Sequence, residues 1–393
     1  MNKGTYITIT LMTTVVFVAV TMCANYVLDP LMVFRSESNP DKVQKPAFEK
    51  NVRLAKAHIV QRLKPSAAVL GSSRAEIGLN PGHPGWGDRL VFNSGLPSAS
   101  IAEMSNYLEH LQLAGGLQLA VVGLDLFQFN PDKAGSPDFR ECRLNQGRYP
   151  ELVNSLRRWC DIPYLWISPL GYQQLAAEHS DAPIPSVYLA NGSRGPNAKD
   201  WEIRKLGSQL QLFEASEQEY RSKAGLYDGL ADIGDFANSP VSKAFTEILT
   251  FAHQNEIDTR FIISPSHARQ WETIHAMKLW PTFEDWKRFL VSANQQVARE
   301  HSRDAFPIWD FADYNKFSTE PVPEDTADAP RMKWYWESSH YTKQLGDIVL
   351  NKVLLEDNIE LGKEIGSLTD NELEAWLAII IQNRELWLES TST

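Results

Sequence analysis

The chain begins with a continuous apolar stretch. No charged residue occurs over residues 5–28, and Asp29 then closes the run. As a helix, these 24 residues reach about 36 Å, which is enough to cross a hydrocarbon core of about 30 Å. The apolar region of a signal peptide is usually shorter, and Met22-Cys23-Ala24 lacks the small first residue of a cleavage site. The pattern predicts an uncleaved membrane-spanning helix, with a cleaved signal peptide as the alternative.

Beyond this stretch, short apolar runs alternate with longer amphipathic segments. The apolar runs predict strands at 67–70, 90–92, 117–124, 260–263 and 307–311. Apolar positions at helical spacing predict helices at 45–64, 100–114, 240–255, 283–300, 342–355 and 370–388. Repeated strand-helix units are typical of a doubly wound α/β fold, in which helices cover both faces of a mostly parallel sheet.

One segment interrupts the alternation. Residues 131–234 are rich in Pro, Gly, Asn and Ser, with one clear amphipathic helix near 201–224. Long insertions in α/β folds tend to occur in the loops that form the active site. We therefore expect this insertion to cover the site without forming part of the core. The predicted parts are an anchor (1–30), an α/β domain (31–360) and a C-terminal helix (361–393).

Composition and charge exclude several classes of function. The chain has 393 residues, of which 43% are hydrophobic and 22% charged, as in an ordinary globular protein. Its formal net charge is -11, and no basic stripe is present, so we expect no nucleic-acid partner. No phosphate-binding loop, zinc-ligand spacing or dinucleotide fingerprint occurs, so we expect no metal and no organic cofactor.

The residues around the apolar run predict the compartment. Lys3 is the one positively charged side chain before the run. The positive-inside rule then places the N-terminus in the cytoplasm and the remaining part of about 360 residues on the periplasmic side of the cytoplasmic membrane. In such an oxidising compartment Cys142 and Cys160 can pair, and two free thiols are the other interpretation.

Polar side chains follow the predicted strands at the edge where a parallel sheet binds its ligands. A serine hydroxyl is a weak nucleophile that needs a basic histidine, and the histidine needs a carboxylate to orient it. All three kinds of group occur here, so the edge predicts a serine-dependent acyl-transfer site. Its residues include Gly71, Ser72, Ser73, Arg74, Asn93, Gly95, Asp125, His267, Arg269, Asp310, Asp313, Glu337 and His340.

Three short motifs resemble sequence blocks of the SGNH (GDSL-like) hydrolase superfamily. Residues 69–74 (Val-Leu-Gly-Ser-Ser-Arg) resemble the first block, residues 92–95 (Phe-Asn-Ser-Gly) the second and residues 337–340 (Glu-Ser-Ser-His) the fifth. The Gly-Ser-Ser order is similar to that of the membrane-anchored branch, which includes the D-alanyl transfer protein of teichoic acid synthesis and the alginate O-acetylation proteins. The resemblance implies a flavodoxin-like, doubly wound sheet of about five mostly parallel strands.

The same resemblance implies the roles of individual residues. Ser73 is expected to be the nucleophile, His340 to remove its proton, and Glu337 to orient the imidazole. The backbone amides of Ser73 and Gly95 are expected to form the oxyanion hole. The side chains expected to bind substrate are Arg74, His267, Arg269 and Trp336.

Two positions depart from the family pattern. The third block usually reads Gly-x-Asn and supplies a further oxyanion donor, but Asp125 stands at that position here. An ionised aspartate accepts hydrogen bonds and cannot donate one. The triad acid is Glu337 where the family has Asp. Ser72 remains the alternative nucleophile, and Asp310 and Asp313 remain alternative acids.

These observations predict a membrane-anchored serine acyl esterase or O-acyltransferase acting on an extracytoplasmic polysaccharide. Acetyl is the expected acyl group. Transfer across a membrane needs a delivered acyl donor, so the resemblance also implies a multi-span membrane acyltransferase as partner. The alternative is a catalytically degenerate scaffold that binds glycan or a polysaccharide-assembly partner.

Overall fold

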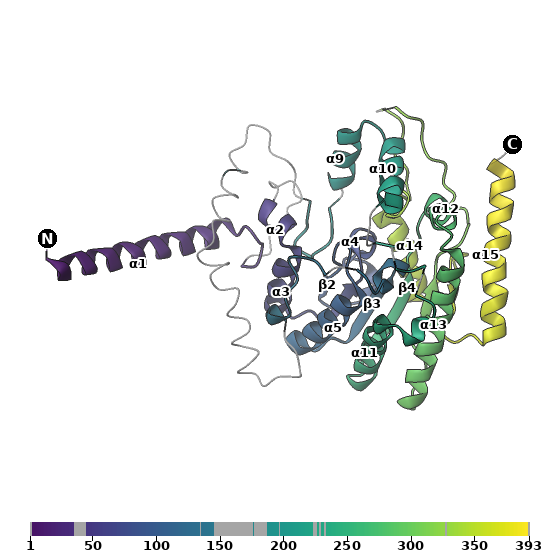
Figure 1. The fold of residues 1–393 in the computed structure, drawn as a ribbon, viewed down its shortest axis with the longest axis horizontal. Coiled ribbons are helices and arrows are strands. Elements are labelled where there is room, and N and C mark those ends of the chain that lie inside the picture. Colours follow the sequence, from purple (N-terminus) through teal and green to yellow (C-terminus); the bar gives the residue numbers. More distant parts are fainter. Residues whose placement is uncertain are drawn as a thin grey trace.

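The computed structural model describes residues 2–34, 45–133, 135–144, 176, 187–195, 197–222, 226–227, 229–231, 233–326 and 328–391. Figure 1 shows an α/β domain from which one long helix, α1, extends to one side. The C-terminal helix α15 lies along the opposite side of the domain.

A six-stranded sheet forms the centre of the domain. Five neighbouring strands are parallel, and the last is antiparallel to β5. This confirms the predicted α/β class with a mostly parallel sheet, and each predicted apolar run overlaps a strand. The pattern does not predict β6, because two residues carry no apolar run. In sheet order the strands are β2 (Val91–Asn93), β1 (Ala67–Leu70), β3 (Leu119–Leu124), β4 (Asp258–Ile263), β5 (Ile308–Asp310) and β6 (Lys363–Glu364).

The helices begin where the sequence supplies caps. Ser100 and Glu103 form a reciprocal capping box at the start of α5, and Pro240 occupies the first turn of α11. The predicted helix at 45–64 is two helices that meet at Asn51. The α-helices are α1 (Lys3–Leu28), α2 (Pro46–Lys50), α3 (Val52–Leu63), α4 (Ser73–Gly78), α5 (Ile101–Gly115), α9 (Asn197–Leu206), α10 (Gln209–Ser222), α11 (Pro240–Gln254), α12 (Ala268–Ala276), α13 (Trp280–Glu300), α14 (Lys343–Leu355) and α15 (Asp370–Thr391).

Each face of the sheet has its own apolar core, because alternate strand residues point to opposite faces. On one face Leu70 and Phe261 pack with buried residues of α3, α5, α11 and α13. On the other face Val69 and Ile262 pack with residues of α4 and α14. The domain therefore has three layers, with the sheet between two layers of helices.

The predicted insertion at 131–234 contributes residues to the hydrophobic core. Its helices α9 and α10 lie at one end of the domain, at the top of the view in Figure 1. Gly207, with a φ of 108°, separates these two helices where the sequence predicts one. Phe213 of α10 is fully buried in the α4 and α14 core, so the insertion contributes to the core and the expectation is corrected. Cys160, and the disulfide prediction with it, lies outside the described residues.

Helix α1 is long and apolar enough to cross a membrane, and most of its side chains are exposed. At its end Asp29 adopts a left-handed conformation with a φ of 41°. The Asp29 carboxylate accepts the backbone N–H of Val33 at 2.8 Å, and Leu31 and Met32 then enter the core. The predicted single-pass anchor is thus joined to the domain by a short buried turn.

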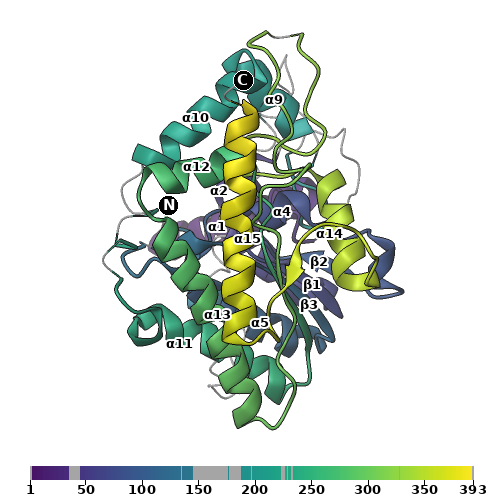
Figure 2. The ribbon, with the colours of Figure 1, turned by 90° about the vertical axis from the view of Figure 1, so that its right-hand side faces the viewer.

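The C-terminal segment is attached to the sheet as well as to the helical layer. The strand β6 pairs with β5, so the predicted boundary at residue 361 falls within one structural unit. Figure 2 shows α15 running across the face of the domain beside α13. Leu373, Leu377 and Ile380 of α15 are buried in the core, and the Trp376 indole donates to Asp310 Oδ2 at 2.9 Å.

Candidate active site

Ser73 lies at the first position of α4, in the turn that follows β1, the strand between β2 and β3. The turn before it requires Gly71, whose φ is 143° and whose added Cβ would meet Ala75 Cβ at 2.7 Å. Ser72 caps the helix, since its Oγ accepts the Arg74 N–H at 3.1 Å. This tight turn leaves Ser73 half-buried at the carboxyl end of β1.

Ser73 and His340 are in contact although 267 residues separate them in the chain. The Ser73 Oγ lies 2.8 Å from His340 Nε2, and His340 Nδ1 contacts Glu337 Oε1. Because an ionised carboxylate only accepts, this contact places the ring proton on Nδ1. Nε2 is then the unprotonated nitrogen that can take the Ser73 hydroxyl proton.

The loop that carries Glu337 and His340 folds around the carboxylate. Glu337 Oε1 also accepts the His340 N–H at 2.9 Å and the Ser339 hydroxyl at 2.8 Å, and Oε2 accepts the Ser339 N–H at 2.9 Å. Burial alone would raise the pKa of Glu337, but the His340 ring and a hydrogen bond from Ser216 outweigh it and hold the pKa at about 2. Glu337 is therefore ionised at neutral pH.

The low pKa of Glu337 predicts a loss of stability in acid. Its folded-state pKa is about 2 against an ordinary value of 4.5, so between these values the unfolded chain binds more protons. The contribution of Glu337 should be complete above pH 4.5 and fall as the pH decreases toward 2. Urea unfolding of the full chain in detergent checks this, with a smaller fall expected for Glu337→Gln. Equal falls in both chains would contradict it.

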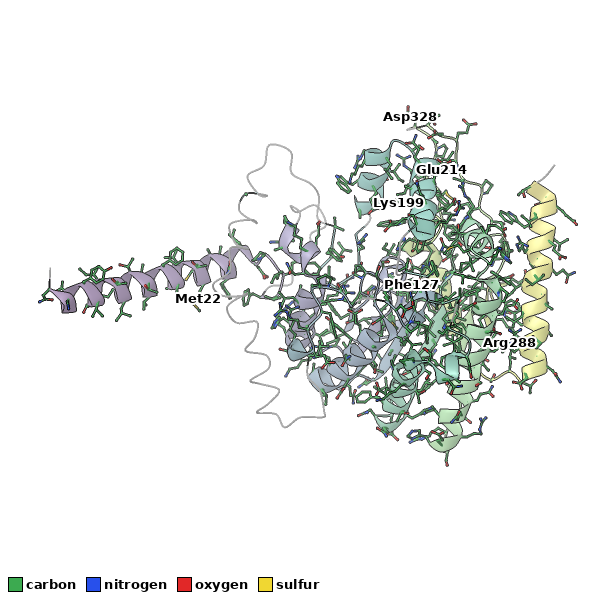
Figure 3. All side chains as sticks on the ribbon, viewed as in Figure 1. Met22, Phe127, Lys199, Glu214, Arg288 and Asp328 are labelled. Carbon is green, nitrogen blue, oxygen red and sulfur yellow. The ribbon has the colours of Figure 1, made fainter. Side chains whose placement is uncertain are left out.

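Asp125, which stands where the third block usually has its asparagine, bonds to two neighbouring side chains. Its Oδ2 accepts the Ser72 hydroxyl at 2.6 Å, and its Oδ1 pairs with Arg74 Nη1 at 2.8 Å. Arg74 is only 3% exposed, and its guanidinium lies over the ring of Phe127, labelled in Figure 3. Arg74 is thus a buried partner of Asp125, and the substrate contact predicted for it stays a prediction.

The Gly95 amide is also engaged, contrary to the expected oxyanion role. Its N–H donates to Asn93 Oδ1 at 2.9 Å, and the Asn93 side-chain amide donates to the Ala75 and Leu79 carbonyls. This network ties the end of β2 to α4. The Ser73 N–H, at the start of α4, has no acceptor among the hydrogen bonds of the described residues. Of the two backbone amides predicted to form the oxyanion hole, only that of Ser73 is without an acceptor among the described hydrogen bonds.

His267 and Arg269 both have protein partners. His267 is buried, caps α12 through Nδ1 and contacts the Glu320 carbonyl through Nε2 at 2.8 Å. Its burial lowers the pKa to about 4, so the ring is neutral at pH 7. Arg269 forms a two-pronged ion pair with Glu217 of α10, at 2.6 and 3.0 Å. The substrate contacts predicted for these two residues stay predictions.

The alternative acids lie elsewhere. Asp310 pairs with Lys287 at 2.7 Å, and both side chains are fully buried. Asp313 accepts a hydrogen bond from Asn383 of α15 at 3.0 Å. Among the described residues, Glu337 contacts His340 and neither aspartate does. The chain of contacts from Ser73 through His340 to Glu337 is called the relay below.

A pocket of about 500 Å³ is lined by residues close in sequence to Ser73 and His340, although neither of these two residues lines it. Its wall includes Ile77, four residues after Ser73, and Trp336, four residues before His340. Trp336 lines this pocket although it is largely buried, and the substrate contact predicted for it stays a prediction. The basic side chains in this wall are Arg194, Lys199 (labelled in Figure 3), Arg331, Lys333 and Lys343.

The sequence analysis did not predict two residues that contact the loop of Glu337, Ser216 and Tyr220. Ser216 donates to Glu337 Oε2, and Tyr220 donates to the Ser339 hydroxyl at 2.9 Å. Both come from α10, more than 115 residues before the loop that they contact. The sequence signals only an amphipathic helix there, so nothing links these two residues to the acid. Among the described residues, no three His, Cys, Asp or Glu side chains gather as metal ligands would.

No model of a known protein family matches the chain, and no curated protein matches it. In the described residues, Ser73 contacts His340, and His340 contacts the ionised Glu337. The resemblance to SGNH hydrolases stays a prediction.

Proposed function

We propose that the protein is a membrane-anchored, SGNH-like serine acyl esterase or O-acyltransferase. The observation that carries this proposal is the chain of contacts from Ser73 Oγ through His340 to Glu337. The strand order supports it, because β2-β1-β3-β4-β5 is the order of flavodoxin-like, doubly wound folds. Such folds bind ligands where the order reverses, beside β1, and Ser73 follows β1 directly.

In the proposed first half-reaction, Ser73 Oγ attacks the carbonyl carbon of an acyl ester while its proton passes to His340 Nε2. Glu337 holds the ring and stabilises the imidazolium. The tetrahedral oxyanion faces the free Ser73 N–H. Collapse breaks the ester bond, the leaving alcohol takes the proton from Nε2, and the acyl group stays on Ser73.

The second half-reaction decides between hydrolysis and transfer. If water attacks the acyl-serine, the product is a free carboxylic acid and the enzyme is an esterase. If a sugar hydroxyl attacks, the acyl group, which we take as acetyl, moves onto the glycan. The pocket whose wall includes Ile77 and Trp336 has space for a sugar unit, and α1 would place the domain on the periplasmic side of the cytoplasmic membrane. A multi-span acyltransferase would then supply the acyl donor.

The scaffold alternative is favoured by the occupied oxyanion donors. The Gly95 N–H bonds to Asn93, and Asp125 offers no donor at all. One missing oxyanion donor typically costs about 10²–10³ in rate. A protein with the relay but a poor oxyanion hole would bind a glycan or an assembly partner without turning it over.

An acetate-release assay distinguishes these functions. The full chain in detergent is incubated with an O-acetylated polysaccharide, with and without an unacetylated acceptor glycan. The proposal expects acetate release or acetyl transfer, and no turnover by Ser73→Ala. Glycan binding by the wild type without any acetyl release or transfer would establish the scaffold.

A further inference from the structure

One face of α10 contacts the whole loop that carries the acid and the base. Gln209, Phe213, Ser216 and Tyr220 recur at helical spacing and so share this face. The Gln209 amide nitrogen donates to the Tyr335 and Trp336 carbonyls, both at 3.0 Å, and its oxygen accepts the Met332 N–H. These bonds fix the backbone just before Glu337.

Further along the same face, hydroxyl groups reach the carboxylate itself. Ser216 Oγ donates to Glu337 Oε2, and Ser339 Oγ donates to Oε1 at 2.8 Å. Tyr220 in turn donates to Ser339 Oγ at 2.9 Å. Among the described hydrogen bonds to Glu337, the one from Ser216 alone comes from outside residues 337–340. Oε2 also accepts the Ser339 N–H and the Ser338 hydroxyl, whereas Oε1 faces the imidazole.

Tyr220 also reaches the side of the nucleophile. The Arg74 guanidinium lies 5.8 Å from the centre of the Tyr220 ring, and Arg74 pairs with the Asp125 that binds the Ser72 hydroxyl. Burial raises the pKa of the Tyr220 phenol, so it remains a donor at any physiological pH. One helix thus contacts the loop of Glu337 directly and, through Arg74 and Asp125, reaches Ser72, the residue before the nucleophile.

We propose that Ser216 and Tyr220 are positioning residues, which orient Glu337 and through it the imidazole of His340. This inference rests on the proposed function. The inference gives the insertion a specific role. Ser73, His340 and Glu337 keep their contacts only while α10 packs against residues 335–340. A merely structural α10 would hold the fold together without affecting the catalytic step.

Steady-state kinetics on 4-nitrophenyl acetate separates the two roles, using the full chain in detergent. A hydrogen bond to a charged group is worth enough that Ser216→Ala should lower kcat about 10- to 100-fold. The KM should stay unchanged, because Ser216 does not touch the ester. Tyr220→Phe should show a smaller loss in kcat, since it acts through Ser339.

Matched variants complete the test. Ser216→Thr keeps the hydroxyl and should restore most of kcat. Ser222→Ala, on the same helix, removes an exposed hydroxyl that bonds only to its own helix and should match the wild type. An unchanged kcat in Ser216→Ala would overturn the inference. So would a loss that Ser216→Thr fails to restore, because that indicates a structural role.

If the wild type has no activity, the proposed function is overturned, and kinetics cannot test the role of Ser216. A second measurement then tests that role without activity. Carbon-13 NMR follows the Glu337 carboxyl with pH, and Glu337→Gln assigns the signal. Loss of the Ser216 hydrogen bond should raise the pKa of Glu337 by about one pH unit. An unchanged pKa in Ser216→Ala would show that Ser216 does not hold the carboxylate.

Discussion

Ser73→Ala and His340→Ala are each expected to lower kcat/KM for an aryl acetate by about 10³-fold or more. Ser73 supplies the atom that bonds to the acyl carbon, and His340 removes its proton across 2.8 Å. Because nucleophile and base act as one unit, the double variant should be scarcely worse than either single one. Stopped-flow measurement of nitrophenolate release by the full chain in detergent checks both expectations.

The controls for this prediction test the assignment of each role. Glu337→Gln should lose less than His340→Ala, since an amide oxygen still accepts from the ring but carries no charge. Asp313→Asn, whose carboxylate bonds to α15, should retain most of the activity. Activity in Ser73→Ala together with its loss in Ser72→Ala would move the nucleophile by one position.

Asp125→Asn is expected to destabilise the protein although it introduces the residue that the family has at this position. Asp125 is the carboxylate partner of Arg74, and both side chains are buried. Removing one member of a buried ion pair leaves an uncompensated charge, which typically costs about 3–5 kcal/mol. The free energy of unfolding in urea should fall by this amount. Esterase activity should not rise, because the side chain at 125 is directed to Ser72 and Arg74.

A double variant isolates the cause of that loss. Arg74→Met combined with Asp125→Asn removes the unpaired charge and should recover much of the lost stability. If Asp125→Asn is instead as stable as the wild type and more active, the side chain reaches the oxyanion, and the family role of this position holds.

The strands could be predicted from the sequence because a parallel sheet covered on both faces requires short, wholly apolar runs. The run at Leu119–Leu124, for example, is buried at every position. The same reasoning misses β6, which has two residues and pairs through its backbone at the edge of the sheet. It also merges α9 with α10, because the break at Gly207 depends on a left-handed backbone angle.

For the candidate site too, the sequence predicts some features and not others. Ser73 and His340 each follow a recognisable motif, and the structure brings them into contact, although their catalytic role stays a prediction. The partners of charged residues are set by tertiary packing, which a sequence pattern does not encode. Arg74 and Arg269 therefore look like surface ligands in the sequence, whereas the structure pairs them with Asp125 and Glu217.

Covalent labelling tests the central claim most directly. A fluorophosphonate reacts only with a serine that a neighbouring base activates, so the probe requires neither a known glycan nor a known donor. The full chain in detergent is treated with the probe and digested, and the modified peptide is identified by mass spectrometry. The relay predicts one adduct, on Ser73, that is absent in His340→Ala. An unlabelled wild-type chain, or a label on another serine that persists in His340→Ala, would contradict it.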